Sequence, residues 1–175
     1  QFSVGNFRSI ADLQTFSMVA APLVGLEPDD GSALIEVDGK LKLLRSAAIY
    51  GANAAGKSNF FQALAAFKFI ATQSLARLEP KDKLRMIEPF LLSTETEEEP
   101  SYFEMVFIAY GTQFRYGLEA TATHIVSEWL FEKKTSRDTR LFTRTEEGIE
   151  VNKSRFKEGI RLEKHTRPNA SFLSV

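Results

Sequence analysis

Eight consecutive residues, from Gly51 to Ser58, constrain the fold of this chain more than any other stretch of its sequence. They read G-A-N-A-A-G-K-S and match the pattern G-x-x-x-x-G-K-[ST]. In that pattern the glycines let the backbone curl so that successive N–H groups point inward, and a lysine and a hydroxyl follow at the start of a helix. Such a loop holds phosphate groups, because the inward N–H groups and the positive end of the helix dipole attract anions at the same point.

The residues on either side of the loop have the patterns that it requires. Before it, Ala47 to Tyr50 form a short, uniformly apolar run, which is typical of a strand buried on both faces of a central sheet. After it, apolar side chains recur at helical spacing until Glu79-Pro80, namely Phe60, Leu64, Phe67, Ala71, Leu75 and Leu78. We therefore predict a buried strand, a phosphate loop and a helix whose apolar stripe packs on the sheet.

The residue types in and after the loop predict separate roles at a nucleotide. The cradle for the β-phosphate is expected to consist of the residues before the lysine: Gly51, Asn53, Ala54, Ala55 and Gly56. Lys57 is placed to neutralise charge on the β- and γ-phosphates, and it is the predicted catalytic residue. The Ser58 hydroxyl is placed to bind Mg²⁺, and the Asn59 side chain can reach phosphate oxygens. The sequence thus predicts ATP and Mg²⁺ as ligands.

The rest of the chain has mainly β-type patterns. Short runs occupy residues 1–45, and Asp38-Gly39 predicts a hairpin turn between two of them. Residues 95–100 are acidic and predict an exposed loop. An alternating pattern over residues 102–132 predicts an antiparallel meander, and a further hairpin is expected across residues 146–148. We divide the chain into a P-loop core part, residues 1–94, and an antiparallel β-subdomain, residues 95–175. The last residues, Ser171 to Val175, are expected to form an apolar strand that enters the core.

The composition excludes several classes of protein. With 43% hydrophobic and 26% charged residues, the chain lies in the range of one globular domain. The absence of Cys and the presence of only two His exclude a disulfide framework and a thiolate zinc site. No apolar run approaches the length that spans a bilayer, so the sequence predicts a cytoplasmic protein without membrane contact.

Charge is distributed unevenly along the chain. Residues 133–175 hold 11 Lys and Arg against 6 Asp and Glu, whereas residues 1–132 hold 11 against 17. A basic stretch of this kind can face nucleic acid or an acidic partner, but its Glu residues are interleaved and its aromatics are few. A solvated face is the favoured interpretation, and nucleic acid stays as an alternative partner.

These motifs together resemble those of a known group of ATPases. The N-F-R-S of Asn6 to Ser9, ahead of the run I-Y-G-A-N-A-A-G-K-S-N, resembles the opening of the SMC, RecF and OLD group of ABC-type ATPases. The E-P-F of residues 88–90, the meander and the P-N-A-S-F-L-S of residues 168–174 resemble in particular prokaryotic members from phage-defence loci of the abortive infection type and from toxin–antitoxin-like loci. The resemblance covers nearly the whole chain, and the phosphate loop is its specific part.

The resemblance implies an α/β fold. This would be a P-loop NTPase of ABC-ATPase type, with a mixed central sheet around the P-loop helix and an antiparallel β-subdomain beside it. It further implies that Arg8 reaches toward the nucleotide phosphates, the alternative being a surface arginine. Asn53 resembles the residue that these ATPases place beside the γ-phosphate, the alternative being a turn residue that tolerates positive φ.

Two motifs that hydrolysis requires in this group do not occur between Gln1 and Val175. One is a Walker B segment, four apolar residues followed by Asp-Glu, and the other is a signature loop of the L-S-G-G-Q kind. In the group both lie C-terminal to the region that resembles this chain. The chain is therefore expected to be a fragment, the N-terminal lobe of such an ATPase, that binds ATP but does not turn it over alone.

The resemblance also implies how the complete protein works. Two copies, as a homodimer or within a higher even oligomer, would enclose ATP and separate on hydrolysis, and the switch would control a partner effector such as a nuclease or toxin in anti-phage defence. The second hypothesis is a DNA repair or DNA-tethering ATPase of RecF or SMC type whose basic segment contacts the duplex. A small kinase or GTPase is disfavoured because the sequence has no N-K-x-D motif.

His124 and Glu128 are the remaining candidates for acid–base chemistry. In an extended strand, residues four apart lie on one face at about 13 Å, which is too far for direct proton transfer. We predict structural roles for both side chains.

Overall fold

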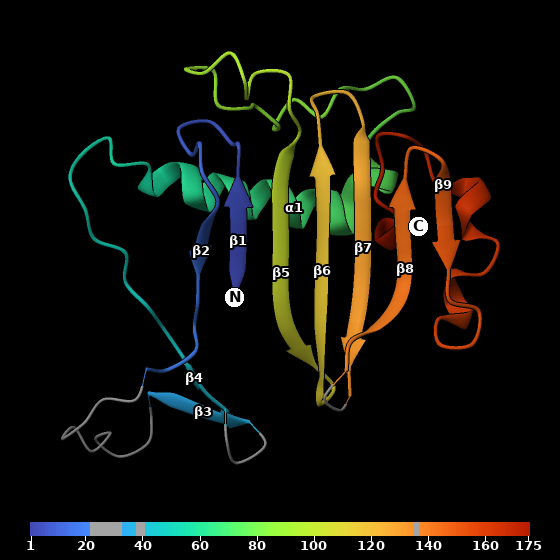
Figure 1. Cartoon of the computed structure of the whole chain (residues 1–175), viewed down its shortest axis with the longest axis horizontal. Helices are drawn as coiled ribbons and strands as arrows, with labels where there is room; N and C mark the ends of the chain where they lie inside the picture. Colours follow the sequence, from blue (N-terminus) through green and yellow to red (C-terminus); the bar gives the residue numbers. More distant parts are fainter. Residues whose placement is uncertain (22–32, 38–40, 135–136) are drawn as a thin grey trace.

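One antiparallel sheet and one long helix dominate the molecule (Figure 1). The computed structural model describes residues 1–21, 33–37, 41–134 and 137–175. Seven strands form the large sheet in the order β2-β1-β5-β6-β7-β8-β9. Their bounds are β1 Phe2–Gly5, β2 Gln14–Phe16, β5 Ser101–Ala109, β6 Thr112–Ala120, β7 Ile125–Lys133, β8 Thr139–Thr145 and β9 Gly148–Val151.

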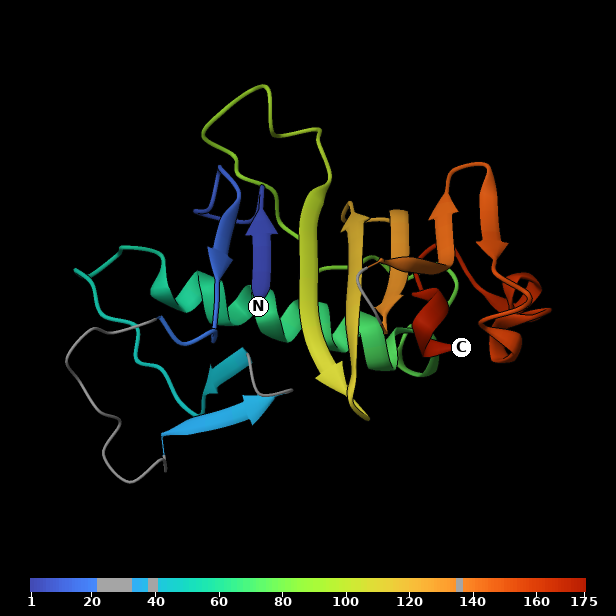
Figure 2. The ribbon, with the colours of Figure 1, turned by 60° about the horizontal axis from the view of Figure 1, so that its bottom comes forward.

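Helix α1, Lys57–Arg77, lies across one face of this sheet (Figure 2). It starts after Gly56, whose φ of 84° is left-handed, and it stops before Leu78, which is extended. The predicted helix is confirmed, but its buried face is rotated relative to the predicted stripe. The residues that it buries are Ala63, Ala66, Phe67, Ile70, Ala71 and Ser74.

Small residues on this face let the helix approach the strands closely, and aromatic rings fill the space between them. The Phe67 ring lies 5.6 Å from that of Phe2 and 5.4 Å from that of Tyr116, measured between centroids. Phe103 and Phe142, on β5 and β8, are fully buried in the same core. Burial of each such side chain stabilises the fold by about 1.5–3 kcal/mol.

Within the described ranges, none of the helices combines the length and apolar character needed to cross a bilayer.

The predicted meander is confirmed as strands β5, β6 and β7, which pair in sequence order. The two-residue turn between β5 and β6 places Tyr110 and Gly111 at φ values of 51° and 71°. Such a pair of positive φ values suits the right-handed twist of a hairpin, and Gly111 adopts it without steric cost. The predicted hairpin over residues 146–148 is also confirmed, because β8 pairs with β9 there.

The amino-terminal strands join the same sheet as the meander. Strand β1 pairs with β5 on one side and with β2 on the other. A separate two-stranded sheet pairs β3, Leu34–Val37, with β4, Leu41–Leu44. The hairpin signal Asp38-Gly39 lies outside the described residues, between these two paired strands.

The prediction of a buried strand at Ala47 to Tyr50 is wrong. Residues 46–50 are assigned to no strand, and Tyr50 is 90% exposed. A strand requires hydrogen-bonding neighbours, and no described strand pairs with this segment. All described strand pairs are antiparallel, so the expected mixed central sheet is also not found in the part of the chain that the structure describes.

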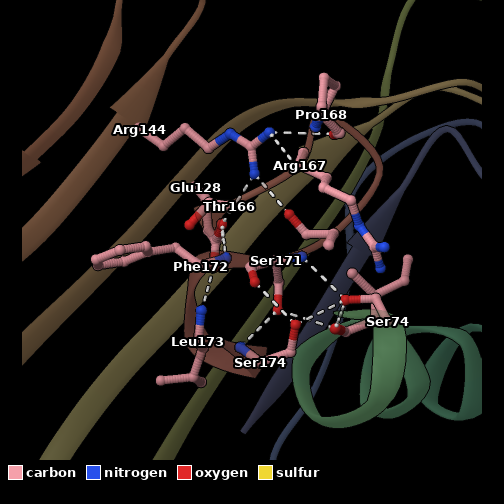
Figure 3. A network of polar contacts seen from close by, with 12 residues as sticks. Ser74, Glu128, Arg144, Thr166, Arg167, Pro168, Ser171, Phe172, Leu173 and Ser174 are labelled. Atoms are coloured by element: carbon pink, nitrogen blue, oxygen red, sulfur yellow. Dashed lines mark hydrogen bonds and ion pairs between the residues drawn. The ribbon is translucent and has the colours of Figure 1, made fainter. Parts of the chain in front are cut away.

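The carboxy-terminal segment is a short 3₁₀ turn, η3 Phe172–Ser174, and the strand predicted over Ser171 to Val175 is wrong. Local hydrogen bonds favour the turn, because the Ser171 hydroxyl accepts from the Ser174 N–H at its start. The fully buried Glu128 on β7 accepts from the N–H groups of Phe172, at 2.8 Å, and Leu173, at 3.3 Å (Figure 3). Two further 3₁₀ turns, η1 Lys157–Gly159 and η2 Leu162–His165, precede it.

Residues 167–171 attach this carboxy-terminal segment to the far end of α1. Arg167 donates to the carbonyl oxygens of Leu75 and Leu78, which are among those left free at a helix carboxyl end. The Ser171 N–H donates to the hydroxyl of Ser74 in the last part of the helix (Figure 3). Arg144 on β8 donates to the carbonyl oxygens of residues 167, 168 and 170.

Candidate functional site

The loop Gly51–Ser58 connects the exposed segment before it to the first turn of α1. Ala54 and Gly56 have φ values of 63° and 84°, while Ala55 between them is not left-handed. Left-handed residues that alternate with right-handed ones turn backbone N–H groups toward one side in anion-binding nests, and the two left-handed residues here suit such a turn. The Ala55 N–H donates to the carbonyl of Ala52 at 3.3 Å. Ala54 has a Cβ, so its left-handed conformation costs about 1–2 kcal/mol. Strain of this kind is concentrated at ligand sites.

Lys57 folds back over the loop that it follows. Its ammonium donates to the carbonyl oxygens of Gly51 and Ala52, at 2.7 Å each. These carbonyl groups hold the charge above the loop, where a nucleotide's β- and γ-phosphates would lie. The structure thus places the predicted catalytic lysine against the predicted cradle.

The start of α1 presents unsatisfied donors to the same place. Its N-cap, Gly56, makes no side-chain capping bond, and the first turn carries no acidic residue. The first N–H groups of a helix have no partner within it, so they and the helix dipole attract an anion. Ser58 is exposed at the second helical position, which suits a hydroxyl that binds Mg²⁺ beside phosphate oxygens.

The three other predicted site residues lie around this centre in different ways. Asn53 is exposed on the loop. Asn59 donates from its side-chain amide to the Ser9 hydroxyl at 2.7 Å. Arg8 donates to Gln62 on α1 and to Glu88 at 3.1 Å, so its guanidinium is held by these two groups. Its contact with a nucleotide stays a prediction.

A pocket of about 720 Å³ opens beside the loop. The residues that line it include Gly56, Lys57, Ser9, Asp12, Phe16 and Tyr50. Its volume lies in the range of small-molecule sites, and its wall combines aromatic and polar side chains in the usual manner. The region next to the phosphate cradle therefore has room for the rest of a nucleotide.

The residues present fit a magnesium-bound triphosphate. The loop and the helix start supply N–H donors, Lys57 supplies a cation, and Ser58 supplies a hydroxyl oxygen. Mg²⁺ usually keeps several waters and takes the substrate's phosphate oxygens together with one or two protein ligands. When bound, the metal would neutralise charge on the phosphates, and this chain's residues would bind and orient them.

Sequence reasoning did not assign a role to Ser9, which lies beside the loop although it is far from it in sequence. Its hydroxyl accepts from Asn59, and it would lie 3.1 Å from a Cβ added to Gly56. The available signal was its place in the N-F-R-S motif.

The structure does not join His124 and Glu128 into an acid–base pair. The His124 ring lies within hydrogen-bond distance of the hydroxyls of Thr121 and Thr123, whereas Glu128 accepts from the Tyr116 hydroxyl at 2.8 Å. Burial raises the pKa of Glu128, although Phe172, Tyr116 and Arg144 donate toward it and lower that pKa. Both side chains have the structural surroundings that we predicted.

A comparison with known protein families gives a match over most of the chain. The model of the family described as "AAA domain, putative AbiEii toxin, Type IV TA system" matches residues 46–175. The matched segment begins just before the phosphate loop and includes α1 and strands β5 to β9. No curated protein and no solved structure matches the chain.

Proposed function

Since the chain belongs to this AAA-domain family and is an AAA-type P-loop ATPase domain, we propose that it binds ATP with Mg²⁺ through Gly51–Ser58. The observation that carries the proposal is the juxtaposition of a left-handed loop, the open start of α1 and the Lys57 ammonium at one pocket. Each of these features stabilises phosphate charge, and together they favour a triphosphate over a neutral ligand.

Lys57→Ala tests this proposal. The side chain is half-buried, and within the described part of the chain its ammonium donates only to loop carbonyls, so its removal should change the melting temperature of the free protein little. Loss of the phosphate partner should weaken Mg²⁺-ATP binding roughly tenfold or more in isothermal titration calorimetry.

Lys68→Ala is the matched control, because Lys68 is an exposed lysine on the same helix. It should bind Mg²⁺-ATP as the wild type does. Equal affinities of all three proteins would contradict a role for the phosphate loop.

We further propose, on the resemblance and on the toxin–antitoxin wording of the family description, that nucleotide binding controls a partner. The protein would be an ABC-type member of the SMC, RecF and OLD group, and it would act as a homodimer or higher even oligomer. In the complete protein ATP would hold two copies together, hydrolysis would separate them, and this switch would control a nuclease or toxin effector in phage defence. Co-purification of an effector that separates on addition of ATP, and not with Lys57→Ala, would support this control. An effector whose retention does not depend on nucleotide would contradict it.

The DNA-contacting alternative has less support, because the basic segment is partly neutralised. Arg140, Arg144 and Arg155 form ion pairs with Glu150, Glu128 and Glu132. Arg167 is engaged at the end of α1. Duplex binding that weakens steeply with salt would favour this second function.

A further inference from the structure

The tight turn Asn6–Ala11, between β1 and β2, is built as a rigid hairpin. Phe7 and Ile10 exchange two backbone hydrogen bonds of 2.8 Å, and the Asn6 N–H donates to the carbonyl of Ala11 at 3.1 Å. Asn6 and Arg8 both have left-handed φ values, 48° and 50°. Two residues strained in this way persist only where surrounding contacts hold them.

Those contacts come from the segment that leads into β5. The buried Asn6 side-chain amide donates to the carbonyl oxygens of Thr96 and Glu99 at 2.8 Å, and it accepts from the Phe90 N–H. The Arg8 N–H donates to the carbonyl of Glu88. The hairpin is therefore fixed to the body of the protein before it reaches the nucleotide site.

The tip of the hairpin forms hydrogen bonds with two residues in the first turns of α1. The Ser9 hydroxyl accepts from Asn59, and the Arg8 guanidinium donates to Gln62. Asn59 and Gln62 are three residues apart and so lie on the same side of the helix. Ser9 also packs against Gly56, where an added Cβ would come within 3.1 Å of its hydroxyl oxygen.

These contacts matter because α1 begins without a cap of its own. Gly56 has no side chain to bond the first N–H groups, and a phosphate-binding loop must leave those groups free for the ligand. Without a cap, the N–H groups of the first turn stay directed toward the ligand only if other contacts fix that turn. A contact to the side chain of Asn59 achieves this without occupying a backbone donor.

We propose that Ser9 is a positioning residue of the phosphate loop, acting through Asn59 to fix the first turn of α1 for the nucleotide. The proposal rests on the proposed ATP-binding function. Ser9 and Asn59 act as one unit, and Arg8 holds the adjacent turn through Gln62.

Hydrogen exchange of the nucleotide-free protein tests the positioning apart from ATP binding. Ser9→Ala should speed amide exchange over residues 60–63, whose N–H groups are the first to be hydrogen-bonded within α1, whereas Ser17→Ala should not. Ser17 is an exposed serine whose hydroxyl, among the residues that the structure describes, accepts only from the Val19 N–H. Unchanged exchange in Ser9→Ala would overturn the proposal even if the protein binds ATP.

A double-mutant cycle tests the consequence for the ligand. Ser9→Ala should weaken Mg²⁺-ATP binding between about threefold and tenfold, the range expected for one hydrogen bond. The melting temperature of the free protein should stay within error of the wild type. The double variant Ser9→Ala/Asn59→Ala should bind no more weakly than Asn59→Ala alone.

Losses that add fully in the double variant would overturn the proposal, because Asn59 would then act independently of Ser9. Wild-type affinity in Ser9→Ala, with loss in Lys57→Ala, would overturn the positioning and leave the proposed ATP binding intact. No ATP binding by the wild type would instead contradict the proposed function, and the exchange experiment would still decide the role of Ser9.

Discussion

Lys57 and Ser58 are neighbours at the start of α1, and the roles proposed for them concern different parts of the ligand. The Lys57 ammonium donates to loop carbonyls, and we propose that it would act on phosphate charge directly. The exposed Ser58 hydroxyl would hold Mg²⁺, which would supply neutralisation of phosphate charge when bound. Removal of the Lys57 ammonium and removal of the Ser58 hydroxyl should therefore affect ATP binding differently.

Ser58→Ala should weaken ATP binding in a metal-dependent way. With Mg²⁺ present, we expect a loss of roughly tenfold, since the variant removes one oxygen ligand. In EDTA the affinity should change little, because alanine preserves the helix and its N–H groups. Titration calorimetry in the two buffers measures the difference. Equal losses in both buffers would show that the hydroxyl does not act through the metal.

At the residue scale, the contiguous part of the site could be predicted and the remote part could not. Gly56, Lys57 and Ser58 are adjacent, so their pattern alone specifies a loop and a helix start. Ser9 lies beside the phosphate loop only because β1 and β2 fold beside α1. The residues next to Ser9 in the sequence do not reveal this proximity. The attachment of Arg8 to Gln62 and Glu88 has the same non-local origin.

Among the elements, strand β7 has an unusual buried charge. Glu128 is fully buried, accepts from two N–H groups of η3 and from the Tyr116 hydroxyl, and forms an ion pair with Arg144 at 3.6 Å. Burial raises its pKa above the ordinary value of 4.5. The Glu128 carboxyl thus binds a proton more tightly in the folded state than in the unfolded state. The stability that this protonated carboxyl contributes is fully present below the unfolded pKa and is lost as pH rises through the folded pKa.

Glu128→Gln should remove this pH dependence. We expect the free energy of unfolding of the wild type, relative to that of the variant, to decrease as pH rises from the unfolded pKa toward neutrality. The variant is also less stable at every pH, because its amide nitrogen faces N–H donors. Urea unfolding over a pH series measures both effects. Parallel curves for the two proteins would contradict a raised pKa.

Elements with a local pattern could be predicted, whereas those that depend on distant partners could not. Helix α1 and strands β5 to β7 follow from spacing within each segment and from turn residues such as Gly111. The run Ala47 to Tyr50 has strand composition, but pairing requires a neighbour that the described sheet does not provide. The turn at Phe172 depends on Glu128, 44 residues earlier in sequence.

For the whole molecule, the chain should bind ATP without turning it over. Residues 1–175 contain no Asp-Glu pair after an apolar run. A positioned carboxylate that holds Mg²⁺ and orients water contributes several kcal/mol to catalysis. A colorimetric phosphate assay should give the same rate for the wild type and for Lys57→Ala. Release that Lys57→Ala abolishes would show that residues 1–175 contain a complete active site.

Helix α1 is held at both ends by parts of the chain that are remote in sequence. Its 21 residues extend about 30 Å. The hairpin Asn6–Ala11 forms hydrogen bonds with its first turns. Arg167 and Ser171 form hydrogen bonds with its last turn. A ligand that displaced the first turn of α1 would therefore have to break the hairpin contacts, bend the helix, or shift the carboxy-terminal attachment as well.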